Sequence, residues 1–172
     1  MKIGVLAVQG AFIEHEHIIE KIGHEVVEIR QRKDLDGIDG IILPGGESTV
    51  QGQLIRKLDM LATIKSLITD GLPTLATCAG LILLAGHIDN DDSIHIGTLP
   101  VTVKRNAYGR QLGSFVRTAP MKGFDKFPMT FIRAPYISSI KDNVDVLAAV
   151  DDRTVAVQYN NQIGLAFHPE LS

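Results

Sequence analysis

The first half of the chain alternates short apolar runs with longer segments whose apolar residues recur at helical spacing. Four runs have the length and bounding turn residues of buried strands: 3–8, 25–29, 40–43 and 72–77. Two segments between them, about 11–23 and 51–70, predict helices. Strands that alternate with helices in this way are typical of a parallel sheet covered by helices on both faces.

The second half has a different sequence pattern, in which short strand-like runs are separated by turn residues. These runs lie at about 98–104, 113–117, 129–133, 145–150, 154–159 and 162–167. We expect them to add antiparallel strands to the sheet. The fold class predicted from the sequence is therefore α/β, with a mostly parallel central sheet, helices on both faces and added antiparallel strands.

Composition limits the classes of protein to consider. A chain of 172 residues with 45% hydrophobic residues suits a single globular domain over 1–172. A net charge of −3 without a block of like charges gives no footprint for nucleic acid or an anionic membrane. The chain has one cysteine and no apolar run long enough to span a bilayer. We expect a soluble cytoplasmic protein that has no internal disulfide and binds neither nucleic acid nor membrane.

The single cysteine, Cys78, lies between a predicted strand and the apolar start of a predicted helix, within Ala76-Thr77-Cys78-Ala79-Gly80. A nucleophile on such a turn stands clear of the sheet, and small neighbours relieve the crowded backbone. The N–H group of the next residue then points at the group under attack. On its own, a single cysteine in an apolar setting is more often a small core residue.

Two further segments have the composition of functional loops. Leu43-Pro44-Gly45-Gly46-Glu47-Ser48-Thr49 follows a predicted strand, and its paired glycines let backbone N–H groups approach a ligand. A plain strand-to-helix turn explains it equally well, and it matches no phosphate-binding motif. Phe167-His168-Pro169-Glu170 follows the last apolar run. Two side chains two apart in an extended segment point the same way, so Glu170 can orient the His168 imidazole as a base for a thiol. On its own, such a His-x-Glu pair is more often part of an exposed strand end.

The remaining polar features predict no site by themselves. His15 and His17 lie two apart on a predicted helix, so they face different directions and cannot readily share a metal ion. The acidic turn 89–93 lacks the glycine and glutamate that a calcium loop needs at its sixth and twelfth positions. The polar segment 105–111 suits a binding loop, and a plain hairpin connection accounts for it as well.

In this order, the motifs resemble those of the class I, or triad, glutamine amidotransferases, and within them the glutaminases of pyridoxal 5'-phosphate synthesis. The resemblance covers essentially the whole chain. It rests on Gly4-Val5-Leu6-Ala7-Val8-Gln9-Gly10, Leu43-Pro44-Gly45-Gly46-Glu47-Ser48-Thr49, Thr77-Cys78-Ala79-Gly80-Leu81, Arg105-Asn106-Ala107-Tyr108-Gly109-Arg110-Gln111, Phe131-Ile132-Arg133-Ala134-Pro135 and Phe167-His168-Pro169-Glu170. It implies a three-layer, flavodoxin-like fold.

The resemblance implies hydrolysis of L-glutamine to L-glutamate and ammonia, through a glutamyl thioester and without a cofactor or metal. Cys78 would be the nucleophile, His168 the general base and acid, and Glu170 the residue that orients the histidine. The ammonia would pass to a separate synthase subunit, within a large hetero-oligomer that makes pyridoxal 5'-phosphate.

The family pattern also implies the glutamine site and the oxyanion hole. Glutamine binding falls on Gly46, Glu47, Ser48, Arg105, Ile132 and Arg133. We expect the backbone N–H groups of Gly46 and Ala79 to form the oxyanion hole. Gln9 is expected near this hole, where it would couple activity to binding of the synthase subunit.

The sequence departs from the family pattern at two places. Ala76 stands where relatives commonly carry glycine, and we expect its methyl group to be tolerated. Relatives continue past His-Pro-Glu-Leu into a further helix, which we expect this chain to lack. Two alternatives stay open at this point: an amidotransferase subunit that feeds a different synthase, and a non-catalytic module that keeps the fold.

Overall fold

The computed structural model describes residues 1–105 and 113–172. Its strands are β1 (Lys2–Leu6), β2 (Glu25–Ile29), β3 (Gly40–Leu43), β4 (Thr74–Thr77), β5 (Ala85–Ile88), β6 (Leu99–Lys104), β7 (Ser114–Met121), β8 (Phe124–Ile132), β9 (Tyr136–Ile140), β10 (Asp145–Val150), β11 (Arg153–Tyr159) and β12 (Gln162–Leu165). Its helices are α1 (Ile13–Lys21), α2 (Ser48–Lys57), α3 (Leu61–Thr69) and α4 (Ala79–Leu84), with short 3-10 helices η1 (Arg32–Leu35) and η2 (Pro169–Leu171).

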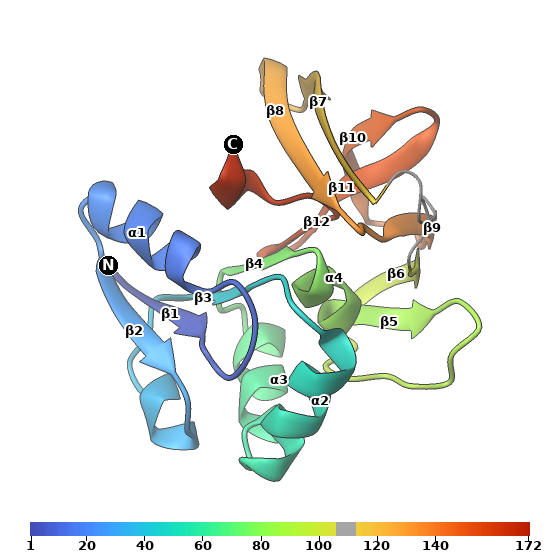
Figure 1. Ribbon diagram of the computed structural model, residues 1–172. Helices are drawn as coiled ribbons and strands as arrows, with labels where there is room; N and C mark the ends of the chain where they lie inside the picture. Colours follow the sequence, from blue (N-terminus) through green and yellow to red (C-terminus); the bar gives the residue numbers. More distant parts are fainter. Residues whose placement is uncertain (106–112) are drawn as a thin grey trace.

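Ten of the described strands form one mixed sheet in the order β2-β1-β3-β4-β12-β11-β9-β6-β5, with β10 paired to β11 (Figure 1). The part from β2 to β12 is parallel, and β11 and β9 continue it in antiparallel pairing. The hairpin β7–β8 forms a separate two-stranded sheet. The predicted α/β fold with added antiparallel strands is confirmed. No helix among the described residues is long and apolar enough to cross a membrane.

Helices cover both faces of the parallel part of the sheet. On one face, Ile19 of α1 packs with Val5 and Ile42 in a small apolar cluster. The alternate residues Leu6 and Leu43 point to the other face, where they join the main core beneath α2, α3 and α4. The period-2 alternation of these strands therefore separates the two helical layers.

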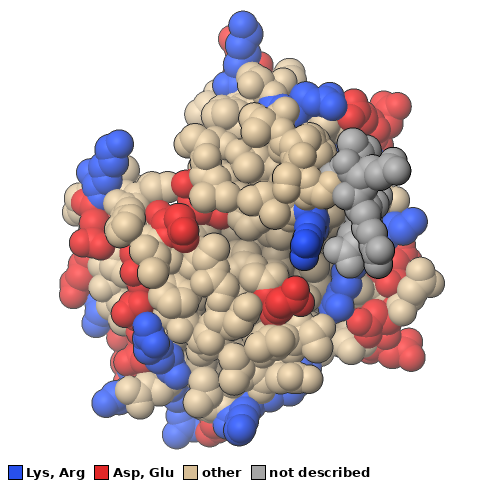
Figure 2. Space-filling model, viewed as in Figure 1, with Lys and Arg blue, Asp and Glu red and all other residues tan. Residues whose placement is uncertain are grey.

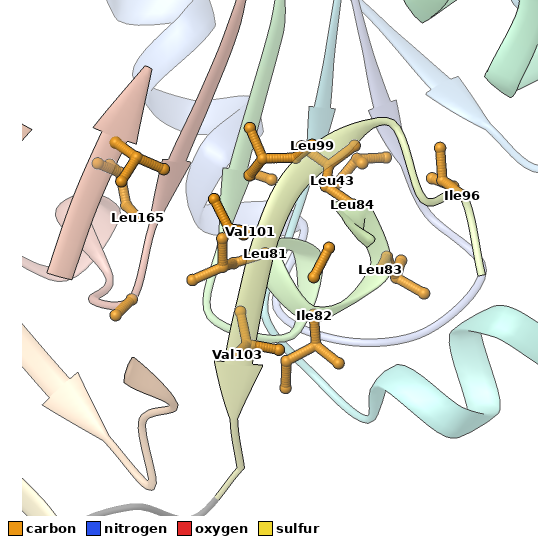
Figure 3. Packing of buried hydrophobic residues seen from close by; sticks show 14 of the residues in the cluster. Leu43, Leu81, Ile82, Leu83, Leu84, Ile96, Leu99, Val101, Val103 and Leu165 are labelled. Carbon is orange, nitrogen blue, oxygen red and sulfur yellow. The ribbon is translucent and has the colours of Figure 1, made fainter. Parts of the chain in front are cut away.

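The short helix α4 is buried along its whole length and lies at the centre of the main core. In Figure 3, Leu81 and Leu84 of this helix lie in one apolar cluster with Leu43 of β3 and with Leu99 and Val101 of β6. Gly80 makes this packing possible, because a Cβ at this position would overlap the backbone carbonyl oxygen of Leu43. The close crossing fixes where α4 begins, one residue after Cys78.

The single helix predicted over 51–70 is wrong, because the chain breaks it into α2 and α3. The backbone N–H of Asp59 donates to the carbonyl oxygen of Arg56, and that of Met60 donates to the carbonyl oxygen of Ile55. This is the hydrogen-bond pattern of a Schellman motif at a helix end. Asp59 adopts φ 57° there, a conformation that glycine usually supplies. Met60, the residue after this turn, is fully buried, so its side chain packs into the core where the helix is interrupted.

The sequence pattern does not predict β5 and β9, and it places one exposed residue on the buried stripe of α1. β5 follows α4 with no turn signal between them, and β9 carries polar residues on its exposed face. In the predicted helix 11–23, Phe12, Ile19 and Ile22 recur at helical spacing, a pattern typical of one buried face. Ile22 is exposed, and the buried residues of α1 are His15 and Ile19, which lie one turn apart.

Replacing Gly80 tests the close crossing of α4 over β3. We expect Gly80→Ala to lower the free energy of unfolding by about 3 kcal/mol, since the colliding partner is backbone and cannot rotate away. Chemical denaturation measures the change. Gly86→Ala is the matched control, because its Cβ would approach the nearest atom only to 3.3 Å. Equal stability of the two variants would contradict this account of the crossing.

Candidate active site

A pocket of about 470 Å³ opens at the carboxyl ends of β3, β4 and β12. Most residues that the sequence predicted for catalysis and binding line it: Gly46, Glu47, Ser48, Cys78, Ala79, Arg105, Ile132, Arg133 and His168. The space-filling view shows a hollow on this face, with positive and negative charge at its edges (Figure 2). Segments from across the whole sequence therefore meet at one concave site.

Cys78 occupies a strained turn at the end of β4. Its backbone has φ 51° and ψ −106°, a region that residues other than glycine rarely adopt. The N–H of Cys78 donates to the carbonyl oxygen of Leu165 at 2.8 Å, which anchors the turn to β12. Its Sγ lies 3.8 Å from the carbonyl oxygen of Ile132 and borders the pocket. This is the strand-to-helix geometry expected of a nucleophile.

His168 is buried beside Cys78, and its position is held from two sides. Its backbone N–H donates to the carbonyl oxygen of Thr130 on β8 at 2.7 Å. Its imidazole lies directly against Gly45, where any Cβ would overlap ring atom Cε1. The glycine of the 43–49 loop is therefore needed for close approach of the imidazole.

The charge state of His168 follows from its neighbours. Burial disfavours the imidazolium, but side-chain contacts with Cys78 and Glu170 outweigh this effect and raise the pKa of His168 to about 10. The ring therefore carries a proton at neutral pH. An imidazolium in this place puts positive charge beside Sγ and holds a proton that a leaving group can take.

Glu170 accepts a hydrogen bond from His168 at 2.6 Å, between Oε1 and Nδ1. The expectation of an extended segment is wrong here, because Glu170 lies in the 3-10 turn η2. The turn still brings both side chains together, with the Glu170 side chain fully buried. Its other oxygen, Oε2, lies 3.4 Å from Nε2 of His15 on α1.

His15 is a residue that sequence reasoning missed. Its spacing to His17 argues against a shared metal ion and predicts no other role for it. The useful signal was its spacing, since His15 lies three residues after Phe12 and four before Ile19, on the buried stripe. A histidine in a helix stripe that faces the core needs a polar partner there.

The 43–49 loop is fastened to the segment after β1 through Gln9. The Glu47 N–H donates to Gln9 Oε1 at 2.8 Å, and Gln51 Nε2 donates to the Gln9 carbonyl oxygen at 3.1 Å. Gly46 adopts φ +150°, and a Cβ there would overlap Gln9 Oε1. Gln9 thus supports the backbone of a predicted oxyanion residue, although it does not line the pocket itself.

Arg105 reaches the pocket rim from the end of β6. Its Nη1 donates to Thr49 Oγ1 at 3.3 Å, and its Nη2 lies 3.6 Å from Asp91 Oδ2. Asp91 belongs to the acidic turn that the sequence left without a role. The rest of the predicted segment, 106–111, lies outside the described residues.

The site has the parts of a thiol-based acyl-transfer centre rather than those of a metal centre. A thiol, an imidazolium and a buried carboxylate follow one another, and glycine-rich backbone borders the same space. Within 1–105 and 113–172, no group of three or more His, Cys, Asp or Glu side chains is arranged to hold a metal ion.

The proton affinity of His168 provides a test of this arrangement. We expect Glu170→Gln to lower the pKa of His168 below about 10, because the carboxylate that stabilises the imidazolium is lost while burial still opposes the charge. The ring would then deprotonate at lower pH. NMR titration of the His168 Hε1 resonance measures this. Glu20→Gln, which changes an exposed carboxylate, is the control. An unchanged titration of His168 in Glu170→Gln would refute the proposed role of the carboxylate.

Comparison with known proteins agrees with the geometry. Residues 5–172 match the model of the SNO glutamine amidotransferase family. The chain is 58% identical to the pyridoxal 5'-phosphate synthase subunit PdxT of Desulfitobacterium hafniense (strain DSM 10664 / DCB-2), over 100% of this chain and 87% of that protein. It is 51% identical to the subunit of the same name from Streptococcus pneumoniae (strain CGSP14), over 100% of this chain and 91% of that protein.

Solved structures give the same result. One described as a glutamine amidotransferase superposes with a TM-score of 0.95 at 37% identity, covering 99% of this chain and 91% of the other. The family match, the high identity to the two subunits and the shared fold agree. This chain belongs to the SNO glutamine amidotransferase family.

Proposed function

We propose that this chain hydrolyses L-glutamine to L-glutamate and ammonia with Cys78, His168 and Glu170 as its catalytic triad. The observation that carries the proposal is the order of these groups at one pocket, with Cys78 on a strained turn, His168 beside it and Glu170 buried behind His168. Membership of a glutamine amidotransferase family supplies the reaction type.

The first half-reaction breaks the side-chain amide of glutamine. The Cys78 thiolate attacks the amide carbon, and the carbonyl oxygen becomes an oxyanion. The backbone N–H groups of Gly46 and Ala79, which border the same pocket, stabilise this charge. His168 gives its proton to the nitrogen, ammonia leaves, and a glutamyl thioester remains on Cys78.

The second half-reaction regenerates the enzyme. His168, now neutral, takes a proton from water, and the resulting hydroxide attacks the thioester carbon. A second oxyanion forms at the same place and collapses to release L-glutamate, leaving the Cys78 thiolate and the His168 imidazolium. Glu170 keeps the ring oriented throughout, and its negative charge favours the imidazolium that both steps use.

The α-amino and α-carboxylate groups of glutamine bind at the pocket rim. Arg105 and Arg133 supply positive charge for the α-carboxylate, and Glu47 supplies a carboxylate for the α-ammonium group. Ser48 and Ile132 complete the glutamine site. The Arg105 guanidinium is already directed by Asp91 and Thr49, so little side-chain entropy remains to be lost on binding.

The ammonia serves the synthesis of pyridoxal 5'-phosphate (vitamin B6) in a separate synthase subunit. Relatives at 58% and 51% identity carry the name of a subunit of that synthase, which supports this partner and a hetero-oligomeric complex. A single free cysteine suits the reducing cytoplasm, where we place this complex. Gln9 links the segment after β1 to the loop of Gly46, so movement of that segment on binding would reach the oxyanion hole. Coupling of activity to the synthase subunit has a physical route there.

Release of glutamate from L-glutamine tests the proposal. The chain is assayed alone and mixed with a pyridoxal 5'-phosphate synthase core subunit, with Cys78→Ala as the catalytic control. We expect release to rise with the partner and to vanish in Cys78→Ala, because no other residue supplies the thioester. No release from folded, partner-bound protein would exclude glutaminase activity.

The contact between His168 and Gly45 gives a finer prediction. We expect Gly45→Ala to lower kcat about 100-fold. The added Cβ would overlap the imidazole and push it away from Sγ, and a misplacement of about 1 Å is enough for such a loss. Thermal stability should change little, since the colliding partner is a side chain that borders the pocket and can move into it. Steady-state kinetics measure kcat. Gly40→Ala, at the other end of β3, is the matched control, and equal kcat in both variants would contradict the contact.

A further inference from the structure

His15 is a buried polar residue that the mechanism above does not use. It lies on the first turn of α1 and is 4% exposed. Its Nε2 is 3.4 Å from Glu170 Oε2 and 3.4 Å from Thr77 Oγ1. Thr77 directly precedes Cys78, so His15 contacts the segments that carry both ends of the triad.

Glu170 needs a partner on the side that faces His15. Its Oε1 accepts the hydrogen bond from His168, whereas Oε2 is buried and makes no hydrogen bond within the described residues. A carboxylate oxygen can only accept, so a favourable contact requires the Nε2 of His15 to carry the hydrogen. The Thr77 hydroxyl oxygen can then act as a second acceptor for the same N–H.

The character of this partner suits the reaction. Burial lowers the pKa of His15, and this effect outweighs the opposite influence of Glu170, so the ring is neutral at neutral pH. The other charged groups that act on it are His168, which lowers the pKa further, and Glu14, which raises it. A neutral ring offers Glu170 an N–H group and leaves the carboxylate charge for His168. A lysine or arginine would compete with His168 for that charge.

We propose that His15 is a positioning residue that holds the Glu170 carboxylate, and through it the His168 imidazole, in the reactive orientation. This inference rests on the proposed triad and extends it by one residue. Helix α1 also contacts η2, the turn that carries Glu170 (Figure 1). The first helix therefore helps to build the active site, although none of its residues belongs to the proposed triad.

The test compares three variants in the complex with the synthase subunit. His15→Leu fills the space without a donor, His15→Gln restores an N–H at similar reach, and His17→Leu alters an exposed histidine of the same helix. For His15→Leu we expect kcat about tenfold lower with KM changed less than about twofold, by analogy with the loss of an outer-shell hydrogen-bond partner. His15→Gln should recover most of kcat, and His17→Leu should match the wild type.

The pH profile separates positioning from a merely structural role. Without His15, the Glu170 carboxylate is held less firmly against Nδ1 of His168, so the pKa of His168 falls below about 10 and the basic limb of kcat against pH moves to lower pH. His15→Gln should move that limb back. A kcat loss in His15→Leu that persists in His15→Gln with an unchanged pH profile would overturn the proposal.

Combination with Glu170→Gln distinguishes failure of the inference from failure of the triad. If His15 acts through Glu170, His15→Leu should lower kcat no further in the Glu170→Gln background. Full activity of Glu170→Gln alone would overturn the triad, and with it this inference. A low kcat in Glu170→Gln together with normal kcat in His15→Leu would overturn only the role of His15.

Discussion

The parallel pairing of β4 with β12 determines where the proposed catalytic groups meet. Thr77 pairs with Leu165, so both strands end at the same level of the sheet. Cys78 follows the first of these residues directly, and its N–H bonds the carbonyl oxygen of the second. The chain then needs only three residues after β12 to bring His168 alongside the sulfur. A shift of one residue in this register would turn one of the two side chains to the opposite face.

The proposed catalytic groups are held by neighbours from separate layers of the fold. β8 fixes the backbone of His168 through Thr130, and the glycine loop after β3 admits its ring. Helix α1 covers the face of the sheet opposite to α2, α3 and α4, and it places His15 against Glu170. Precise orientation therefore depends on the packing of the whole domain, and a substitution far from the pocket can disturb it.

The sequence predicted the parts of the site that local chemistry dictates. A cysteine between small residues at a strand end, paired glycines after a strand and a histidine two residues before a glutamate are each visible in a short window. Their predicted roles in catalysis remain proposals, whereas the placement of the glycines, Cys78 and His168 at one pocket is observed. The alternating strands and helices predicted the fold class for the same reason.

The missed features depend on tertiary contacts. The break between α2 and α3 carries no glycine or proline, because Asp59 takes the conformation that glycine usually supplies. His15 and Asp91 are ordinary polar residues in the sequence and gain partners only when α1 meets η2 and the acidic turn meets the end of β6. No window around either residue contains those partners.

The long sequence separation of the site segments has a kinetic consequence. The supporting Gln9 lies near the start of the chain and His168 near the last described residues, so almost the entire polypeptide must be arranged before the site exists. Closing such long loops is slow, and non-local contacts of this kind form late in folding. During folding, Cys78 therefore stays apart from His168 until most of the chain is in place.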